Sequence, residues 1–443
     1  MTRALCRSLL LLAVAAVPLR AQDTSRVLDQ GVRVGITYSP GMRPGLVVVP
    51  TAGLDSLRAI LQRDLDFSDQ FELVILPAST RGSTGGLSSG SSTASAPLNY
   101  SLYRSLGASY AVECYPAGAS GRVAVRIHDV GGATIRREGT FTIPEPWEPG
   151  FRQAVHRLSD EVVRWITGVP GFAATQIAFV ADKRIWRVDT DGAGLSALTN
   201  PGEEPLSPTW SPDGRRIAFT MFGGGRGSIV VQTLATGARA TVPTTERNLN
   251  ITPAFSPDGR TLAFAHSSED GTDIFTADMI ERCCVQRLTV GRYADNLSPT
   301  YAPDGRRMAF VSTRAELPQI YSMAADGTDQ ELLAPFDYGI TGSSNAPDWS
   351  PDGARVVFHR DVGQTLQIFL LDVASRRVRQ LTSTGRNEDP SWAPDGRHIT
   401  FVSDRSGRGQ LWVIDVETGR IRQVSTPGAA RLPAWSRRLD GIP

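Results

Sequence analysis

The chain has 443 residues, of which 41% are hydrophobic and 21% are charged, so it is long enough for two or three domains with buried cores. Its formal net charge of +1 excludes the strong positive field that nucleic-acid binding needs. Lys183 is the single lysine. A phosphate-loop lysine or a Schiff-base lysine is therefore excluded at every other position.

The first 21 residues have the pattern of a cleaved signal peptide. Arg3 and Arg7 supply the charged start, residues 9–17 form the apolar run, and Ala21 marks the expected cleavage point. The run is too short to span a bilayer, and no later apolar run is long enough for a membrane helix. We therefore expect an exported protein that is not embedded in a membrane.

Residues 22–168 contain no repeat and predict a small α/β domain with a mixed sheet. The expected elements, in chain order, are a strand at 46–49, a helix over 54–65, a strand at 71–76, strands at 110–114, 123–128 and 135–141, and a closing helix over 151–166. Residues 79–97 are rich in serine, glycine and threonine and predict a mobile loop. Gly168 is expected to end the closing helix and to begin a linker.

Residues 169–443 repeat a unit of the form Pro-x-aromatic-Ser/Ala-Pro-Asp-Gly. The aromatic residues are separated by 45, 46, 48, 43 and 43 residues, a spacing that is typical of a four-stranded propeller blade. Proline, aspartate and glycine favour a tight turn, because proline presets φ, aspartate bonds the local backbone and glycine accepts a positive φ. The aromatic positions are Trp210, Phe255, Tyr301, Trp349, Trp392 and, in a decayed last copy, Trp435.

The repeat predicts an all-β propeller of six blades that the C-terminal strand closes. A strand of the Ile-Ala-Phe type occurs six times, and its first copy, at 177–179, has no aromatic strand before it. The last aromatic motif, around Trp435, has no blade after it. Pairing these two incomplete ends would leave no open sheet edge. The alternative is an open array of five and a half units with exposed edges.

Residues that formally match chemical motifs lie in the wrong contexts. Residues 86–90 read G-x-S-x-G, but they lie in the Ser/Gly-rich segment and not between a strand and a helix. Residues 189–192 resemble the start of a calcium loop but lack the remaining ligands, and we expect a turn there. We therefore predict no catalytic residue, no cofactor, no metal and no enzymatic activity.

Four cysteines are present, and Cys6 lies in the signal peptide. Cys114, Cys283 and Cys284 remain, and an odd count with one adjacent pair is not a disulfide framework. Export would permit a bond between the adjacent pair. We expect instead that all three serve as small buried side chains.

Two stretches outside the repeat carry a family resemblance. One is the helix-to-strand passage from Leu61 to Phe71, and the other is the junction from His156 through Gly168 to Val180. With these stretches, and with the order of signal, α/β domain and six blades, the chain resembles the TolB family, the periplasmic proteins of the Tol–Pal envelope system. The resemblance implies a monomeric, non-enzymatic periplasmic scaffold that supports outer-membrane integrity and constriction at cell division. A propeller enzyme, or a binder of a small ligand or peptide, is the alternative.

Polar residues precede each aromatic strand and follow each Phe-containing strand, so we expect them at one face of the ring. They favour a protein or peptide ligand, although Asn and Asp also serve turn geometry. The residues are Glu204, Asn248, Asn250, Glu269, Asn296, Arg314, Asn345, Asn387, Glu388, Asp389, Asp404, Arg405 and Arg431.

The resemblance implies that this face binds the lipoprotein Pal and that the mature N-terminus binds TolA, with other envelope proteins as further candidates. The segment 22–35 alternates weakly and is consistent with a strand that adds to a partner's sheet. Its expected contact residues are Gln22, Asp23, Val27, Leu28, Val32 and Val34.

Overall fold

A five-stranded mixed sheet forms the N-terminal part of the computed structural model, in the order β2-β1-β3-β4-β5. Strand β1 runs parallel to β2 and β3, and the other pairs are antiparallel. The strands are β1 (Gly45–Val48), β2 (Glu72–Leu73), β3 (Ala108–Pro116), β4 (Arg122–Asp129) and β5 (Thr134–Thr142). The structure describes residues 43–76, 98–118, 121–223, 226–243, 249–281, 283–291, 294–336, 342–424 and 426–439. The predicted signal peptide, the loop at 79–97 and the motif at 86–90 lie outside these residues.

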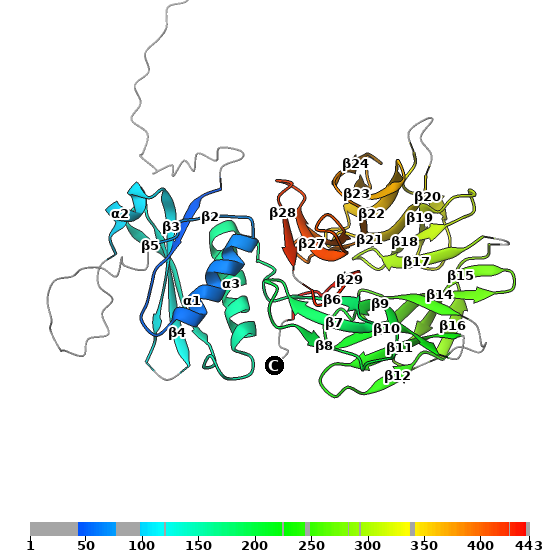
Figure 1. The fold of residues 1–443 in the computed structure, drawn as a ribbon, viewed down its shortest axis with the longest axis horizontal. Helices are drawn as coiled ribbons and strands as arrows, with labels where there is room; N and C mark the ends of the chain where they lie inside the picture. The colour runs from blue at the N-terminus through cyan, green and yellow to red at the C-terminus, as the bar shows by residue number, and fades with distance from the viewer. Residues whose placement is uncertain are drawn as a thin grey trace, which may run out of the picture. The chain divides into compact units, whose positions relative to one another are not determined.

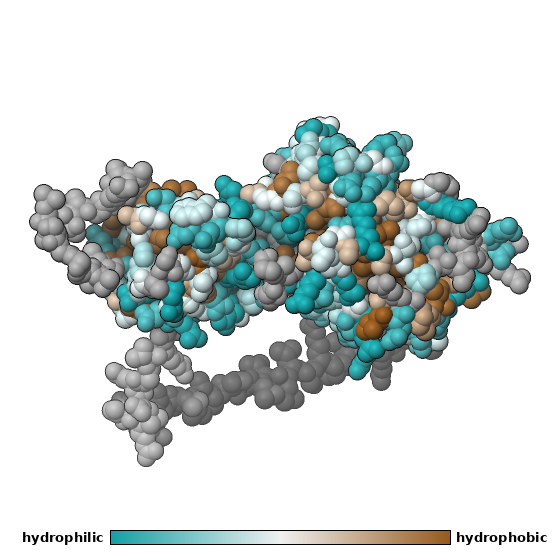
Figure 2. All heavy atoms as spheres, turned by 90° about the horizontal axis from the view of Figure 1, so that it is seen from below, coloured by the Kyte–Doolittle hydropathy of each residue, from teal (hydrophilic) through white to brown (hydrophobic). Residues whose placement is uncertain are grey.

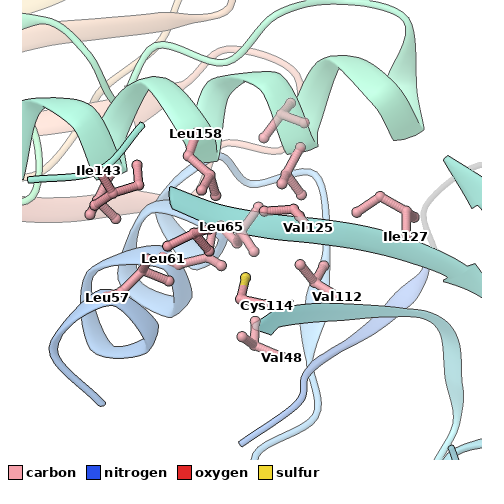
Figure 3. Packing of buried hydrophobic residues seen from close by; sticks show 14 of the residues in the cluster. Val48, Leu57, Leu61, Leu65, Val112, Cys114, Val125, Ile127, Ile143 and Leu158 are labelled. Atoms are coloured by element: carbon pink, nitrogen blue, oxygen red, sulfur yellow. The ribbon is translucent and has the colours of Figure 1, made fainter. Parts of the chain in front are cut away.

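Helices α1 (Asp55–Phe67) and α3 (Phe151–Thr167) cover one face of this sheet (Figure 1). Leucines of both helices, such as Leu61 and Leu158, pack on Cys114 and its neighbours, and none of these three side chains is more than 3% exposed (Figure 3). The expected burial of Cys114 is therefore confirmed. As the pattern predicts, α3 ends at Gly168, which has a φ of 85°.

A short helix, α2 (Tyr100–Ser105), was not expected from the sequence. Its start carries a cap, because the Asn99 side chain accepts a hydrogen bond of 3.0 Å from the backbone N–H of Leu102. Asparagine is among the favoured residues at the start of a helix, so Asn99 could have predicted where α2 begins. The helix has six residues and shows too little periodicity to be recognised by spacing.

The remaining strands form six four-stranded sheets, which are the blades of the propeller. The last blade joins the two ends of this region, because β29 (Arg431–Trp435) pairs with β6 (Gln176–Ala181), and the two lie side by side in Figure 1. Strands β7 (Arg184–Asp189) and β8 (Ser196–Ala197) complete that blade. The other blades are β9 (Pro205–Trp210), β10 (Arg216–Gly223), β11 (Arg226–Thr233) and β12 (Arg239–Thr241); β13 (Asn250–Phe255), β14 (Thr261–Ser268), β15 (Gly271–Asp278) and β16 (Cys283–Arg287); β17 (Asn296–Tyr301), β18 (Arg307–Ser312), β19 (Gln319–Ala324) and β20 (Glu331–Leu332); β21 (Ser344–Trp349), β22 (Arg355–Val362), β23 (Thr365–Asp372) and β24 (Val378–Gln380); β25 (Asn387–Trp392), β26 (His398–Ser403), β27 (Gln410–Asp415) and β28 (Ile421–Val424).

Ring closure rests on specific contacts as well as on strand pairing. The Trp435 indole N–H donates to the Thr175 hydroxyl at 2.8 Å, and the ring packs edge-on against Phe172. The backbone N–H of Ser436 donates to the Gln176 carbonyl at 2.8 Å. The prediction of a ring closed by the C-terminal strand is confirmed.

The Pro-Asp-Gly turns have the geometry that the residue types predict. In five copies the aspartate accepts a hydrogen bond of 2.9–3.0 Å from the backbone N–H two residues later. The glycines of these turns have φ between 67° and 72°, a range that disfavours side chains. Among the motif aromatics, Trp210 and Trp392 each donate from the indole to a carbonyl of the preceding blade. The repeat thus supplies both the turn and the contact between blades.

Cys283 and Cys284 form a disulfide on β16, the outermost strand of its blade, and Cys284 is exposed. The expectation that these two residues serve as buried free cysteines is therefore wrong. Adjacent cysteines rarely form a bond without strain, but an exposed edge strand leaves room for the backbone to adopt the required shape. At Cys284 the backbone takes a φ of 61°.

Residues 43–443 form one compact unit, in which a buried histidine of the propeller bonds to the α/β domain. His398 lies between two carboxylates: its Nδ1 is 2.6 Å from Asp395, and its Nε2 is 3.1 Å from Asp69, which follows α1. Arg420 also donates to Asp69, at 2.7 Å. Burial alone would lower the pKa of His398, but Asp395 and Asp69 outweigh burial and raise it.

A second buried histidine repeats this arrangement from the other side of the junction. His156 of α3 lies 2.8 Å from Asp64 of α1 and 3.6 Å from Asp189, at the end of β7. Burial would lower the pKa of His156, but the carboxylates of Asp64 and Asp189 raise it to about 10. Arg152 donates to both Asp189 and Asp191, so the acids of this junction already face positive side chains. The turn expected at 189–192 is confirmed, with a hydrogen bond from the Gly192 N–H to the Asp189 carbonyl.

The described surface mixes hydrophilic residues with separate hydrophobic patches, as the face in Figure 2 shows. The most exposed large hydrophobic side chains include Trp147 at 80% and Val290 at 77%. Within the described ranges no helix is long and apolar enough to cross a membrane.

Replacing Trp435 by alanine tests the closing contact. We expect Trp435→Ala to lower the free energy of unfolding by about 3–5 kcal/mol, because it removes a buried ring and leaves the Thr175 hydroxyl without its donor. Urea unfolding followed by circular dichroism measures this loss. Trp147→Ala removes an indole of the same size that is 80% exposed, and we expect a change within about 0.5 kcal/mol. Equal losses in the two variants would contradict the closing role.

The charge of His156 predicts how the domain junction responds to pH. A histidine with a raised folded-state pKa contributes stability below its unfolded pKa of about 6.5 and loses it as pH rises through the folded value. We expect the gap in unfolding free energy between the natural chain and His156→Gln to be widest below about pH 6.5 and to narrow steadily above it. Its electrostatic part is at most about 5 kcal/mol, and we expect it to disappear as pH passes about 10.

His359→Gln is the matched control for this measurement. Burial, and then the charge of Arg386, lowers the pKa of His359 to about 4, so this histidine stays neutral between pH 7 and 11. The gap for His359→Gln should therefore not vary over that range. A gap for His156→Gln that is equally constant would show that His156 is not charged in the folded protein.

Candidate functional site

The propeller has two faces, and the predicted polar residues gather at one of them. We call the end where β9, β13, β17, β21, β25 and β29 begin the strand-start face, and the end with the Pro-Asp-Gly turns the turn face. The antiparallel register brings the start of each first strand beside the end of the second strand, as in the pairs Asn296 with Ser312 and Asn387 with Ser403. Asn248 and the predicted N-terminal contact residues, Gln22, Asp23, Val27, Leu28, Val32 and Val34, lie outside the described residues.

Three of the predicted asparagines lie inside the protein. Asn250, Asn296 and Asn387 are at most 1% exposed. Each donates to the preceding blade: Asn250 to the Gly227 carbonyl at 3.1 Å, Asn296 to Asp273 at 3.0 Å and Asn387 to Gln367 at 2.9 Å. They therefore tie neighbouring blades together and are not available to a partner, so we leave them out of the proposed contact set.

Two predicted arginines donate hydrogen bonds to two of these asparagines. Arg314 donates to Asn296 at 3.1 Å, and Arg405 donates to Asn387 at 2.8 Å. Their guanidinium groups lie over aromatic rings of their own blades, 4.7 Å from the centre of Tyr321 and 4.9 Å from that of Trp412. Arg314 remains exposed and Arg405 half-buried, so both present an ordered cation at the face.

The other predicted residues reach solvent to different extents. Glu204, Glu269, Asp404 and Arg431 are exposed, whereas Asn345 is half-buried. Lys183 donates to Glu204, and the Asp404 carboxylate accepts from the backbone N–H of Arg386 at 2.7 Å.

Several charged residues of the strand-start face surround the start of β25. Arg386 and Glu388 form an ion pair at 3.0 Å. The Asp389 carboxylate accepts from the Leu432 N–H at 3.3 Å, and its own N–H donates to His359 at 3.1 Å. Burial, and then the charge of Glu388, raises the pKa of Asp389 to about 6. A partner that supplies a cation here would meet two acids at the mouth of the channel.

Each first strand contains a backbone irregularity that the sequence did not reveal. The residue before the first proline of every motif has a φ between 49° and 53°, and strand pairing shifts register there. Proline cannot donate a ladder hydrogen bond, so it is accommodated at a bulge. The six residues are Ser207, Thr252, Ser298, Ala346, Asp389 and Leu432. The same irregularity therefore recurs in the first strand of all six blades.

The opposite end of the channel holds a cavity of about 250 Å³ on the turn face. The motif aromatics and turn prolines line it, together with Asp348, which is the one charged residue at the position before the motif aromatic. Burial raises the pKa of Asp348 to about 6, although its carboxylate accepts from the Trp392 N–H at 2.8 Å. Our reading of the sequence missed this residue, and its charge at that motif position was the available signal.

Comparison with known proteins agrees with this architecture. A family model described as the TolB beta propeller domain matches residues 163–338 and 334–442. The Tol-Pal system protein TolB of Bordetella avium is 30% identical over 226 residues, which cover 49% of this chain and 48% of that protein. The TolB of Methylococcus capsulatus is 32% identical over 257 residues, which cover 54% and 55%. The chain thus spans about half the length of the curated relatives it matches.

A solved structure extends the likeness to the α/β domain. TolB from Acinetobacter baumannii superposes with a TM-score of 0.74 at 26% identity, covering 90% of this chain and 98% of that one. The family resemblance inferred from the junction and the repeat is confirmed. Because the family model covers more than half of the sequence and the six blades are present, the chain belongs to the TolB β-propeller family.

Proposed function

We propose that this chain is a periplasmic, non-enzymatic scaffold of the Tol–Pal system that binds Pal at the strand-start face and TolA through its mature N-terminus. In this role it would support outer-membrane integrity and constriction during division. Membership in the TolB family supports the assignment to the Tol–Pal system, because the curated relatives carry the name Tol-Pal system protein TolB.

We choose the strand-start face as the Pal site because the α/β domain bonds to the turn face. Its described bonds to the propeller include those of Asp189 and Asp191 at the end of β7, residues 397–398 after a Pro-Asp-Gly turn, and Arg420 before β28, all at the turn face. The strand-start face makes no described bond to that domain. Its ordered cations and acids are thus free to meet a partner, and such patterns favour specific protein recognition.

The N-terminal segment is suited to a separate binding role. Arg43, at the start of the described range, bonds Glu72 at 2.7 Å and lies 3.6 Å from Asp69 at the domain junction. Residues 22–35 precede this anchor and can be removed without deleting any described contact. A partner that adds this segment as a strand would gain backbone hydrogen bonds and pockets for alternate side chains.

The cavity on the turn face favours a second candidate function, which is binding of a small ligand. Its volume of about 250 Å³ is close to the lower end of ligand sites, and a half-buried acid with a raised pKa, Asp348, lies in its wall. Binding of such a ligand, with no envelope protein recovered, would replace the scaffold proposal.

A charge reversal at Glu388 tests the Pal site. Glu388→Arg places a third cation beside Arg386 and Arg431, and we expect it to weaken Pal binding about tenfold or more, measured by calorimetry with purified Pal. Glu331→Arg is the matched control. Glu331 lies on the exposed strand β20, away from the strand-start face, and forms an ion pair with Arg376. Unchanged affinity in Glu388→Arg, or an equal loss in both variants, would contradict the assignment.

Deletion of residues 22–35 tests the TolA site. We expect loss of TolA binding with the same melting temperature, since the deletion stops short of Arg43 and its contacts. Thermal unfolding and a TolA pull-down measure the two outcomes. Glu388→Arg should keep TolA binding, which separates the two sites, and full TolA affinity in the deletion variant would refute the N-terminal assignment.

A further inference from the structure

The bonded pair Cys283–Cys284 lies at the rim of the propeller, apart from the proposed partner sites. Strand β16 is the last strand of its sheet, and all of its residues after Cys283 are exposed. Exposed apolar side chains lie close by in sequence, with Ile280 at 58% and Val285 at 39% exposure. A disulfide in this position is open to collision with a soluble thiol.

The backbone directs Cys284 outward. Strand pairing joins Thr276 with Gln286 and Asp278 with Cys283, so Ala277 faces two residues, Cys284 and Val285. This is a β-bulge, and the extra residue, Cys284, takes the left-handed conformation at a φ of 61°. Bulges re-aim side chains, and a left-handed non-glycine residue persists where the surroundings hold it. At Cys284 the neighbouring constraint on the backbone is the disulfide bond to Cys283.

The blade does not depend on the sulfur atoms for its hydrogen bonds. Strand β16 pairs with β15 through Phe275 with Arg287 and through Thr276 with Gln286. The preceding turn is held by the Asp278 carboxylate, which accepts from the N–H groups of Ile280 at 2.7 Å and Glu281 at 2.9 Å. Opening the disulfide therefore leaves the strand and the turn with their own bonds.

We propose that Cys283–Cys284 is a thiol–disulfide exchange site that accepts two electrons from a dithiol reductant. The reductant's thiolate attacks Cys284 Sγ, the S–S bond breaks, and Cys283 leaves as a thiolate that takes a proton. The second thiol of the reductant then attacks its own sulfur in the mixed disulfide and releases Cys284. The products are a protein dithiol and the oxidised, disulfide form of the reductant, so atoms and electrons balance.

Cys114 supplies an internal control for this chemistry. It is 3% exposed, and burial, followed by the charge of Glu113, raises the pKa of its thiol to about 12. Relative to its ordinary value of 9.0, this lowers the thiolate fraction about a thousandfold at neutral pH. A reagent that reaches the exchange site should therefore spare Cys114 as long as the protein stays folded.

The experiment treats the folded protein with increasing dithiothreitol, quenches it with iodoacetamide and maps the labels by peptide mass. We expect no label at positions 283 and 284 before reduction and two labels after it, with Cys114 unlabelled and the near-ultraviolet circular dichroism unchanged. Free thiols at 283 and 284 in protein from an oxidising compartment would overturn the proposal. Reduction that begins only when the protein unfolds would also overturn it.

Single variants test which of the two sulfur atoms a soluble reagent reaches more readily, the property on which attack at Cys284 is argued. In a Cys114→Ser background, Cys283→Ser leaves the exposed Cys284, and Cys284→Ser leaves the half-buried Cys283. We expect glutathione disulfide to form a mixed disulfide several-fold faster with Cys284 than with Cys283, as mass spectrometry of timed samples would show. Equal rates, or faster reaction at Cys283, would contradict attack at Cys284.

Discussion

Pairing between β29 and β6 is the constraint on which the propeller depends. Each blade packs its apolar face on the next, so the ring has no stable end until the last strand returns to the first sheet. The pairing joins residues near 177 to residues near 435, and Trp435 fills the contact between them. Every other blade is built from four consecutive strands, and the seam, where β29 pairs with β6, completes the blade that the two ends of the propeller share.

Closure also determines what the strand-start face can offer a partner. Buried asparagines join neighbouring blades, and Arg314 and Arg405 cover two of them while lying on aromatic rings. The polar groups at the channel mouth are therefore held by the propeller before any partner arrives. Preorganised charge reduces the ordering cost of binding and favours specificity. The arrangement of polar groups on this face therefore depends on contacts inside the propeller as well as on the surface residues.

The repeat spacing was sufficient to predict the blades and the turns, because these depend on residues that are close in sequence. It also predicted the closing strand, because the first blade lacks an aromatic strand and the last aromatic motif has no blade after it. It was not sufficient for Asn296 or Asn387, since a residue beside a turn can point either into the gap between blades or outward. The contact between Asp69 and His398 joins residues 329 positions apart, so no local sequence pattern predicts it. The disulfide at Cys283–Cys284 depends on a bulge, which periodicity does not reveal.

The junction between the domains has a consequence for the order of synthesis. The α/β domain is made first, yet the residues that receive it, such as His398 and Arg420, are among the last fifty to be made. They lie in the blade next to the seam, and Arg438, just after β29, donates to the Pro170 carbonyl of the linker. The two domains therefore cannot complete their contact while the chain is still emerging. A product truncated before residue 398 would leave the Asp69 carboxylate without its bonds from His398 and Arg420.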